Sequence, residues 1–128
     1  GGNKKYYSLL GEVNNVNNYL TISDYYIQSS IFGESFPNAL VEAIMHGNLC
    51  IASNLGATGE ILQNIEFLFS WDKKYSLYER LKKAFELNSA SEKEIIISQI
   101  NNIKKNYDKE TVIANYKKLF IKILKKDE

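Results

Sequence analysis

Short apolar runs alternate with amphipathic segments along the first half of the chain. Runs rich in aromatic and β-branched residues, bounded by glycine or polar residues, are typical of buried strands. Four such runs lie at residues 6–10, 25–29, 49–52 and 65–69. The segments between them carry apolar residues at helical spacing. Because strands and helices alternate, we expect an open α/β fold with a parallel sheet of about four strands.

After residue 70 the pattern is helical only, and it predicts three further helices. Their apolar positions are Leu77, Leu81, Ala84 and Phe85, then Ile96, Ile100 and Ile103, and finally Val112, Tyr116, Leu119, Phe120 and Ile123. No repeat or low-complexity linker interrupts this order. We therefore expect residues 1–128 to belong to a single domain.

The most informative stretch is 33–47, GESFPNALVEAIMHG, which predicts a loop that turns into a helix. Pro37 is the only proline of the chain, and we expect it at the first helical position, where a missing N–H costs little. Glu34 or Ser35 can cap the helix. The inward-facing repeat consists of Leu40, Ala43, Ile44 and Gly47. Since the helix is apolar nearly all round, we expect it to be largely buried.

Glu42 stands out because it lies inside this apolar helix. An unpaired buried carboxylate is costly, so Glu42 is expected to have a partner or a polar ligand. The free N–H groups and dipole of the helix start form a ready anion site, about 6 Å along the axis from Glu42. Glu34 in the preceding loop adds a second carboxylate. The alternatives are a structural partner for Glu42 and a simple capping role for Glu34.

Composition narrows the picture further. The formal charge is +1 and 45% of the residues are hydrophobic. The chain therefore lacks the large positive charge that is typical of nucleic-acid-binding proteins. Cys50 is the only cysteine, which excludes an internal disulfide and fits a reducing compartment. Its apolar neighbours predict a buried packing thiol. No run reaches membrane-spanning length and no signal-peptide pattern opens the chain, so we expect a cytoplasmic protein.

Three further features have both a functional and a structural interpretation. His46 follows Glu42 by four residues and could touch it, although a lone histidine has many structural uses. Thr58 and Gly59 could approach a ligand, or could simply form a tight turn. The last helix carries Lys117, Lys118, Lys122, Lys125 and Lys126. These lysines form a solvated face or, as the alternative, contact an anionic membrane surface as a peripheral protein would.

Glu34 and Glu42 are eight positions apart in a run that resembles E-[GS]-F-[GP]-x-x-x-x-E-A-x-x-x-G. This is the signature of retaining glycosyltransferases with the GT-B fold, glycosyltransferase family 4, also called group 1. Weaker matches cover nearly the whole chain, at residues 11–13, 22–24, 29–30, 49–53, 56–61, 107 and 116. The departures from the pattern are Ser29, Ser35, Asn48 and Ala57.

The resemblance implies a Rossmann-like C-terminal domain that binds a nucleotide sugar. It also implies that these residues lack the first strands of that domain and the N-terminal acceptor domain. The isolated chain is therefore expected to be inactive. The implied partners are a nucleoside diphosphate sugar as donor, with no cofactor or metal, and a glycan or lipid-linked acceptor. Synthesis of a surface polysaccharide is the implied setting.

By resemblance, Glu34 would face the donor sugar as the catalytic residue, acting as a nucleophile or an electrostatic stabiliser. Glu42 would accept hydrogen bonds from the ribose hydroxyls. Backbone N–H groups of the helix start would hold the sugar and the diphosphate, with Thr58 as a further donor contact. Those N–H groups belong to Ser35, Phe36, Asn38 and Ala39. The alternatives are a non-catalytic nucleotide-binding module and a sugar-nucleotide epimerase, although an epimerase does not normally carry the Phe-Pro run.

Overall fold

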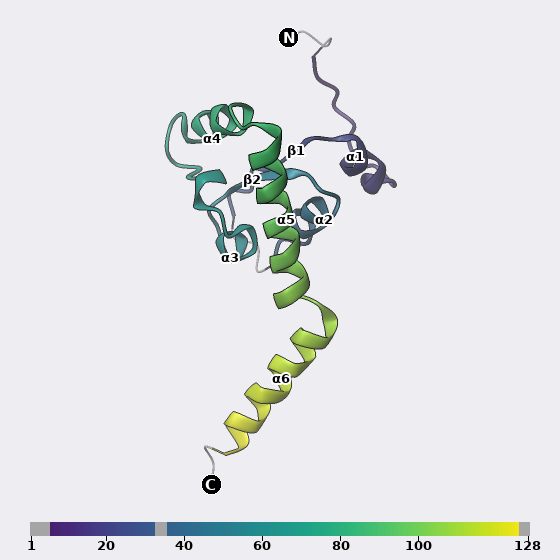
Figure 1. Cartoon of the computed structure of the whole chain (residues 1–128), viewed down its shortest axis with the longest axis vertical. Helices are drawn as coiled ribbons and strands as arrows, with labels where there is room; N and C mark the ends of the chain where they lie inside the picture. Colours follow the sequence, from purple (N-terminus) through teal and green to yellow (C-terminus); the bar gives the residue numbers. More distant parts are fainter. Residues whose placement is uncertain (1–5, 33–35, 126–128) are drawn as a thin grey trace.

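The structure is a computed structural model that describes residues 6–32 and 36–125. Its elements, in chain order, are α1 (Val16–Ile22), β1 (Tyr25–Gln28), α2 (Asn38–Met45), β2 (Leu49–Ser53), α3 (Thr58–Leu62), the 3₁₀ helix η1 (Ile65–Phe67), β3 (Leu68–Phe69), α4 (Ser76–Phe85), α5 (Ser89–Asn106) and α6 (Lys109–Leu124). The expected α/β alternation is confirmed, and the strands are followed by three helices as predicted (Figure 1).

The described strands form one parallel sheet in the order β1-β2-β3. Tyr25 of β1 pairs with Leu49 of β2, and Ala52 of β2 pairs with Leu68 of β3. All five residues of β2 are buried because this strand is central and is covered on both faces. A parallel strand that is buried on both faces is a continuous run of apolar residues in the sequence. This is why the sequence pattern predicted β2 at nearly its observed position.

Two of the four predicted strands differ from the structure. Residues 6–10 form no strand, and Leu9 is 92% exposed. An apolar run becomes a strand only where a neighbouring strand satisfies its backbone groups, and residues 6–10 lead away from the sheet (Figure 1). Residues 65–69 form η1 followed by the two-residue β3. Here the Asn64 side chain accepts the N–H of Glu66 at 3.1 Å, which favours a turn over an extended chain. The described sheet therefore has three strands rather than about four.

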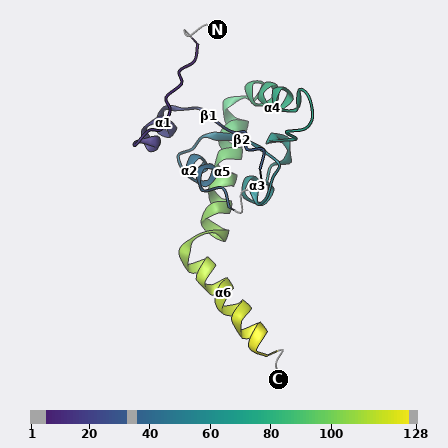
Figure 2. The same cartoon turned by 180° about the vertical axis from the view of Figure 1, so that it is seen from behind.

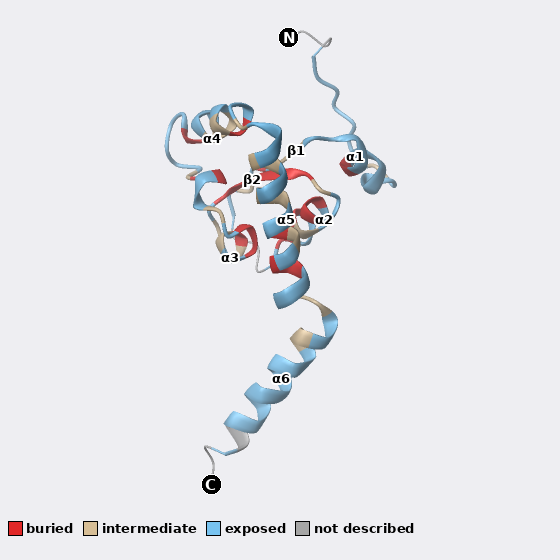
Figure 3. Ribbon diagram, viewed as in Figure 1, coloured by how far each residue is buried: buried red, intermediate tan, exposed pale blue. Residues whose placement is uncertain are grey.

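Helix α5 lies between α2 and α3 in both views of the molecule (Figures 1 and 2). The Asn102 side chain donates hydrogen bonds to the carbonyls of Ile61, at 3.0 Å, and Glu60, at 3.2 Å, which ties α5 to α3. The core beneath these helices is drawn in red in Figure 3. Its largest fully buried apolar side chains are Leu40, Ile44, Leu49, Ile51, Ile61, Leu62 and Phe67.

Helices α1 and α4 are held to the sheet by different contacts. The buried Asn48 side chain donates a hydrogen bond to the Leu20 carbonyl at 2.9 Å, and another to the Ser23 carbonyl. These bonds fasten the end of α1 to the start of β2. Helix α4 packs on β2 and β3, and its Phe85 ring meets Tyr25 edge-on at 5.2 Å between centroids. Phe85 thus contacts the first residue of β1.

Helix α6 extends away from the rest of the molecule (Figure 1). Asp108 starts it by accepting hydrogen bonds from the N–H groups of Glu110 and Thr111, at 2.9 and 3.1 Å. Hydrogen bonds from Thr111 lower the pKa of Asp108, because they stabilise its charged form. From residue 113 to residue 122 every side chain is exposed (Figure 3). Within the described ranges, no helix combines the length and apolar character needed to span a bilayer.

Candidate functional site

The candidate site lies where two parallel strands end and two helices begin. The chain passes from β1 to α2 and from β2 to α3, so both connections start at the same edge of the sheet. Ligands of open α/β sheets bind outside this carboxyl edge. The N–H of Asn54 donates to the Phe69 carbonyl at 2.9 Å, which fastens the start of the second connection to the end of β3.

A tight turn at Pro37 sets the start of α2. Pro37 has φ −81° and ψ 85°, and the Asn38 N–H donates to the Phe36 carbonyl at 3.1 Å, which is the pattern of an inverse γ-turn. Pro37 therefore precedes the helix, which corrects the expectation that it would be the first helical residue. Its carbonyl accepts the N–H of Leu40 at 3.1 Å. Consequently the Asn38 N–H is already engaged within this turn.

Two of the predicted site residues, Glu34 and Ser35, lie outside the described residues. Their assigned roles, including the capping of α2, stay predictions. The structure brings the other members of this group, Phe36, Asn38 and Ala39, together at the start of α2, and all three are exposed.

Helix α2 is not buried all round, so that prediction was wrong. Leu40, Ala43 and Ile44 are buried, while Glu42 on the opposite face is exposed. The reason is that the described sheet and α5 cover this eight-residue helix from one side only. No described cation lies within ion-pair distance of Glu42. Its carboxylate therefore does not need a partner to offset burial in this chain, and it is open to a ligand from solvent.

Gly47 ends α2 and does not continue its buried face, which corrects a second expectation. Gly47 has φ +83°, its N–H donates to the Ile44 carbonyl at 2.9 Å, and the Asn48 N–H donates to the Ala43 carbonyl at 3.1 Å. This pair of bonds is a Schellman motif, in which glycine takes the left-handed position without strain. The neighbouring His46 has its Nδ1 3.3 Å from the Thr21 hydroxyl, so the side chain faces α1 rather than Glu42.

Thr58 lies on the neighbouring helix α3 but is only 2% exposed. Its N–H donates to the Leu55 carbonyl at 3.1 Å, within the turn that starts α3. The side chain is enclosed in this structure, which fits the turn interpretation, and its donor contact stays a prediction. A Cβ added at Gly59 would meet Asn54 and Leu68 at ordinary distances of 3.6 Å, so close packing does not require glycine there.

One contact at the site was not predicted from the sequence. The ring of Phe36, which is 39% exposed, packs against Tyr107 with centroids 5.4 Å apart and planes tilted by 54°. Tyr107 is the C-cap residue of α5. Burial raises the pKa of Tyr107, and the nearby Glu60 carboxylate raises it further. The only signal in the sequence was that Tyr107 matches a family position, because periodicity cannot pair residues so far apart.

Cys50 is a packing residue, as predicted. It is fully buried in β2, and burial raises its pKa to about 12. At neutral pH the sulfur is almost entirely in the thiol form, which is a poor nucleophile.

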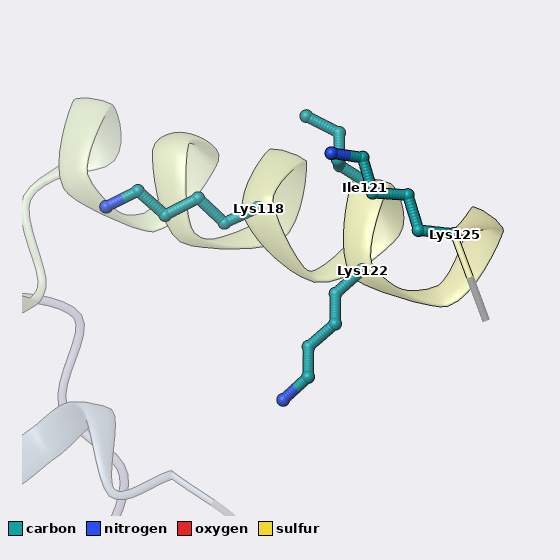
Figure 4. Close-up of a pocket in the computed structure, with 4 residues that line it drawn as sticks. All are labelled: Lys118, Ile121, Lys122 and Lys125. Carbon is teal, nitrogen blue, oxygen red and sulfur yellow. The ribbon is translucent and has the colours of Figure 1, made fainter.

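A surface hollow on α6 is lined by Lys118, Ile121, Lys122 and Lys125 (Figure 4). All four residues belong to the end of the chain that extends away from the sheet. In Figure 4, Lys122 points to the opposite side of the helix from Ile121 and Lys125, so the side chains do not converge on a ligand. We therefore place the candidate site at the start of α2 and not on α6.

Comparisons with known proteins agree with this fold. A family model described as "Glycosyl transferases group 1" matches residues 2–100. No curated protein matches the chain. The crystal structure of a glycosyltransferase from Rickettsia africae ESF-5 is similar in fold, with a TM-score of 0.77 at 23% sequence identity. The alignment covers 92% of this chain and 32% of that one, so the chain spans about a third of the solved protein.

Proposed function

The chain belongs to the group 1 glycosyltransferases, and we propose that the protein containing it is a retaining, family 4 hexosyltransferase. Its donor would be a nucleoside diphosphate sugar and its acceptor a glycan or a lipid-linked glycan, in the synthesis of a surface polysaccharide. The observation that carries the proposal is the exposed Glu42 carboxylate, which lies one turn beyond the start of α2 at the carboxyl edge of the sheet.

The start of α2 suits a diphosphate because the helix dipole places partial positive charge at this end. Glu42 lies one turn further along the helix, where it would accept hydrogen bonds from the ribose hydroxyls of the same donor. A charged acceptor makes such bonds stronger than neutral ones.

The transfer itself needs little covalent chemistry from this domain. The bond between the sugar C1 and the diphosphate oxygen breaks, and its electron pair leaves with the diphosphate. The acceptor oxygen bonds to C1 on the same face, and its proton passes to the departing phosphate oxygen. Glu34 would stabilise positive charge at C1, while the N–H groups of α2 would stabilise the leaving diphosphate without a metal.

The remaining parts of the proposed enzyme would lie in other segments of the protein. The solved glycosyltransferase of similar fold is about three times as long as the aligned part, which leaves room for an acceptor domain. The exposed lysines of α6, among them Lys118, Lys122 and Lys125, would suit an anionic membrane surface on which a lipid-linked acceptor is met.

The test is nucleotide binding to the intact protein with Glu42→Gln, measured by calorimetry against UDP-glucose, GDP-mannose and ADP-glucose. Wild type should bind one of these donors. Glu42→Gln should weaken that binding roughly 10- to 100-fold, the value of charged hydrogen bonds worth about 1.5–3 kcal/mol. Because Glu42 is exposed, the melting temperature should stay unchanged.

Glu79→Gln is the matched control, because Glu79 is an exposed helical glutamate on α4, away from the start of α2. Its affinity for the donor should equal that of wild type. Equal donor affinity in wild type and Glu42→Gln would refute the assignment of Glu42. Binding without any sugar transfer or donor hydrolysis would favour the non-catalytic nucleotide-binding module.

A further inference from the structure

The contact between Phe36 and Tyr107 joins the start of α2 to the end of α5. Phe36 is separated from the helix only by Pro37, and its carbonyl accepts the Asn38 N–H at 3.1 Å. Any shift of Phe36 therefore changes the turn that orients the first N–H groups of α2. Its ring is partly exposed, and the Tyr107 ring covers it on one side, at 5.4 Å between centroids.

Tyr107 is itself held by the rigid part of the fold. Its N–H donates to the Ile103 carbonyl at 2.9 Å, and Ile103 is buried. One residue earlier in the same turn, Asn102 is bonded to the Ile61 carbonyl at 3.0 Å. The end of α5 is thus fixed to α3 by side-chain and core contacts. Tyr107 can therefore act as a fixed support, and Phe36 is the part that it restrains.

We propose that Tyr107 is a positioning residue of the donor site, acting through Phe36. Its ring holds Phe36 in place and keeps the turn at Pro37 in the geometry that sets the direction of the first turn of α2. The ring, and not the hydroxyl, makes the observed contact. This inference rests on the proposed function, since it assumes that the start of α2 binds the donor diphosphate.

The experiment compares wild type, Tyr107→Ala, Tyr107→Phe and Tyr78→Ala in the intact protein. Tyr78 is the matched control, because it is an exposed helical tyrosine on α4. Hydrogen exchange of the peptide covering residues 36–42 reports the order of the first turn. Calorimetry with UDP-glucose, GDP-mannose and ADP-glucose reports donor affinity.

We expect Tyr107→Ala to speed exchange in this peptide by about 3- to 10-fold, as the loss of an aromatic pair would. Donor affinity should fall by a similar factor. Tyr107→Phe should restore both readouts because it keeps the ring, and Tyr78→Ala should change neither. Unchanged exchange in Tyr107→Ala, or failure of Tyr107→Phe to restore it, would overturn the proposal.

The outcomes separate this inference from the proposed function. Faster exchange in a protein that binds none of the three donors would support the positioning contact and overturn the donor site. If Tyr107→Ala does not fold, Phe36→Leu, Tyr107→Leu and the double variant form a cycle with wild type. Effects on exchange that do not add would support the contact, whereas additive effects would overturn it.

Discussion

Strand β2 and helix α6 are both rich in apolar residues, yet they lie in opposite environments. Every residue of β2 is buried, whereas every side chain of α6 described beyond residue 112 is exposed. Strand β2 has a strand on each side and helices over both faces. Helix α6 has its main contact with α5 and extends away from the sheet (Figure 3). Apolar content therefore does not decide burial, because burial depends on what the rest of the chain places beside a segment.

The difference in burial between β2 and α6 predicts which parts of this chain stabilise the fold. Folding free energy comes mainly from the apolar area removed from water, so β2 and the helices around it should supply most of it. Helix α6 should add little. The start of α2 lies at the border of the two environments, with one face in the core and the other open to a ligand.

The largest effect is expected for Ile51→Ala, at the centre of β2. Ile51 is fully buried, so the change leaves a cavity in a well-packed core. The free energy of unfolding of the 128-residue chain should fall by about 2–5 kcal/mol in urea denaturation. A loss below about 1 kcal/mol would show that β2 is not the centre of the core.

A smaller effect is expected for Asn48→Ala, where α1 is fastened to β2. The variant leaves the carbonyls of Leu20 and Ser23 without the Asn48 amide, which should cost about 1–3 kcal/mol of unfolding free energy. Hydrogen exchange should rise in α1 more than in β2. Asn101→Ala on the exposed face of α5 is the control and should change neither quantity by a measurable amount.

The smallest effect is expected for Ile121→Ala on α6, which is the same substitution as Ile51→Ala in the opposite environment. Ile121 is exposed, so no cavity forms, and alanine has a slightly better helix propensity. The urea midpoint should shift by less than the equivalent of about 0.5 kcal/mol. A loss comparable to that of Ile51→Ala would mean that α6 packs against other residues, and the comparison with β2 would fail.

Local pattern was enough to predict much of the fold. The spacing of apolar residues correctly predicted β1, β2 and the last three helices. Such spacing depends only on residues that are close in sequence, so it can be recognised without knowledge of the fold. The buried thiol of Cys50 followed from its apolar run in the same way. The spacing of Phe36 and Glu42 in a family signature also points to the start of α2, where the roles of the site residues stay predictions.

Some of the errors concern partners that lie far away in sequence, and others concern local turns that the period of apolar residues does not report. Residues 6–10 have strand composition but no neighbouring strand, and Glu42 lies in an apolar helix of which only one face is covered. Gly47 continues the helical spacing, yet the chain reverses there with φ +83°.

The sequence by itself determined β1, β2 and the last three helices, and it carried a family signature at the start of α2. Only the tertiary structure decided which faces are buried and that the Tyr107 ring packs against Phe36. The physical reason is that periodicity reports neighbours along the chain, while burial and ring contacts arise between segments that meet only when the chain folds.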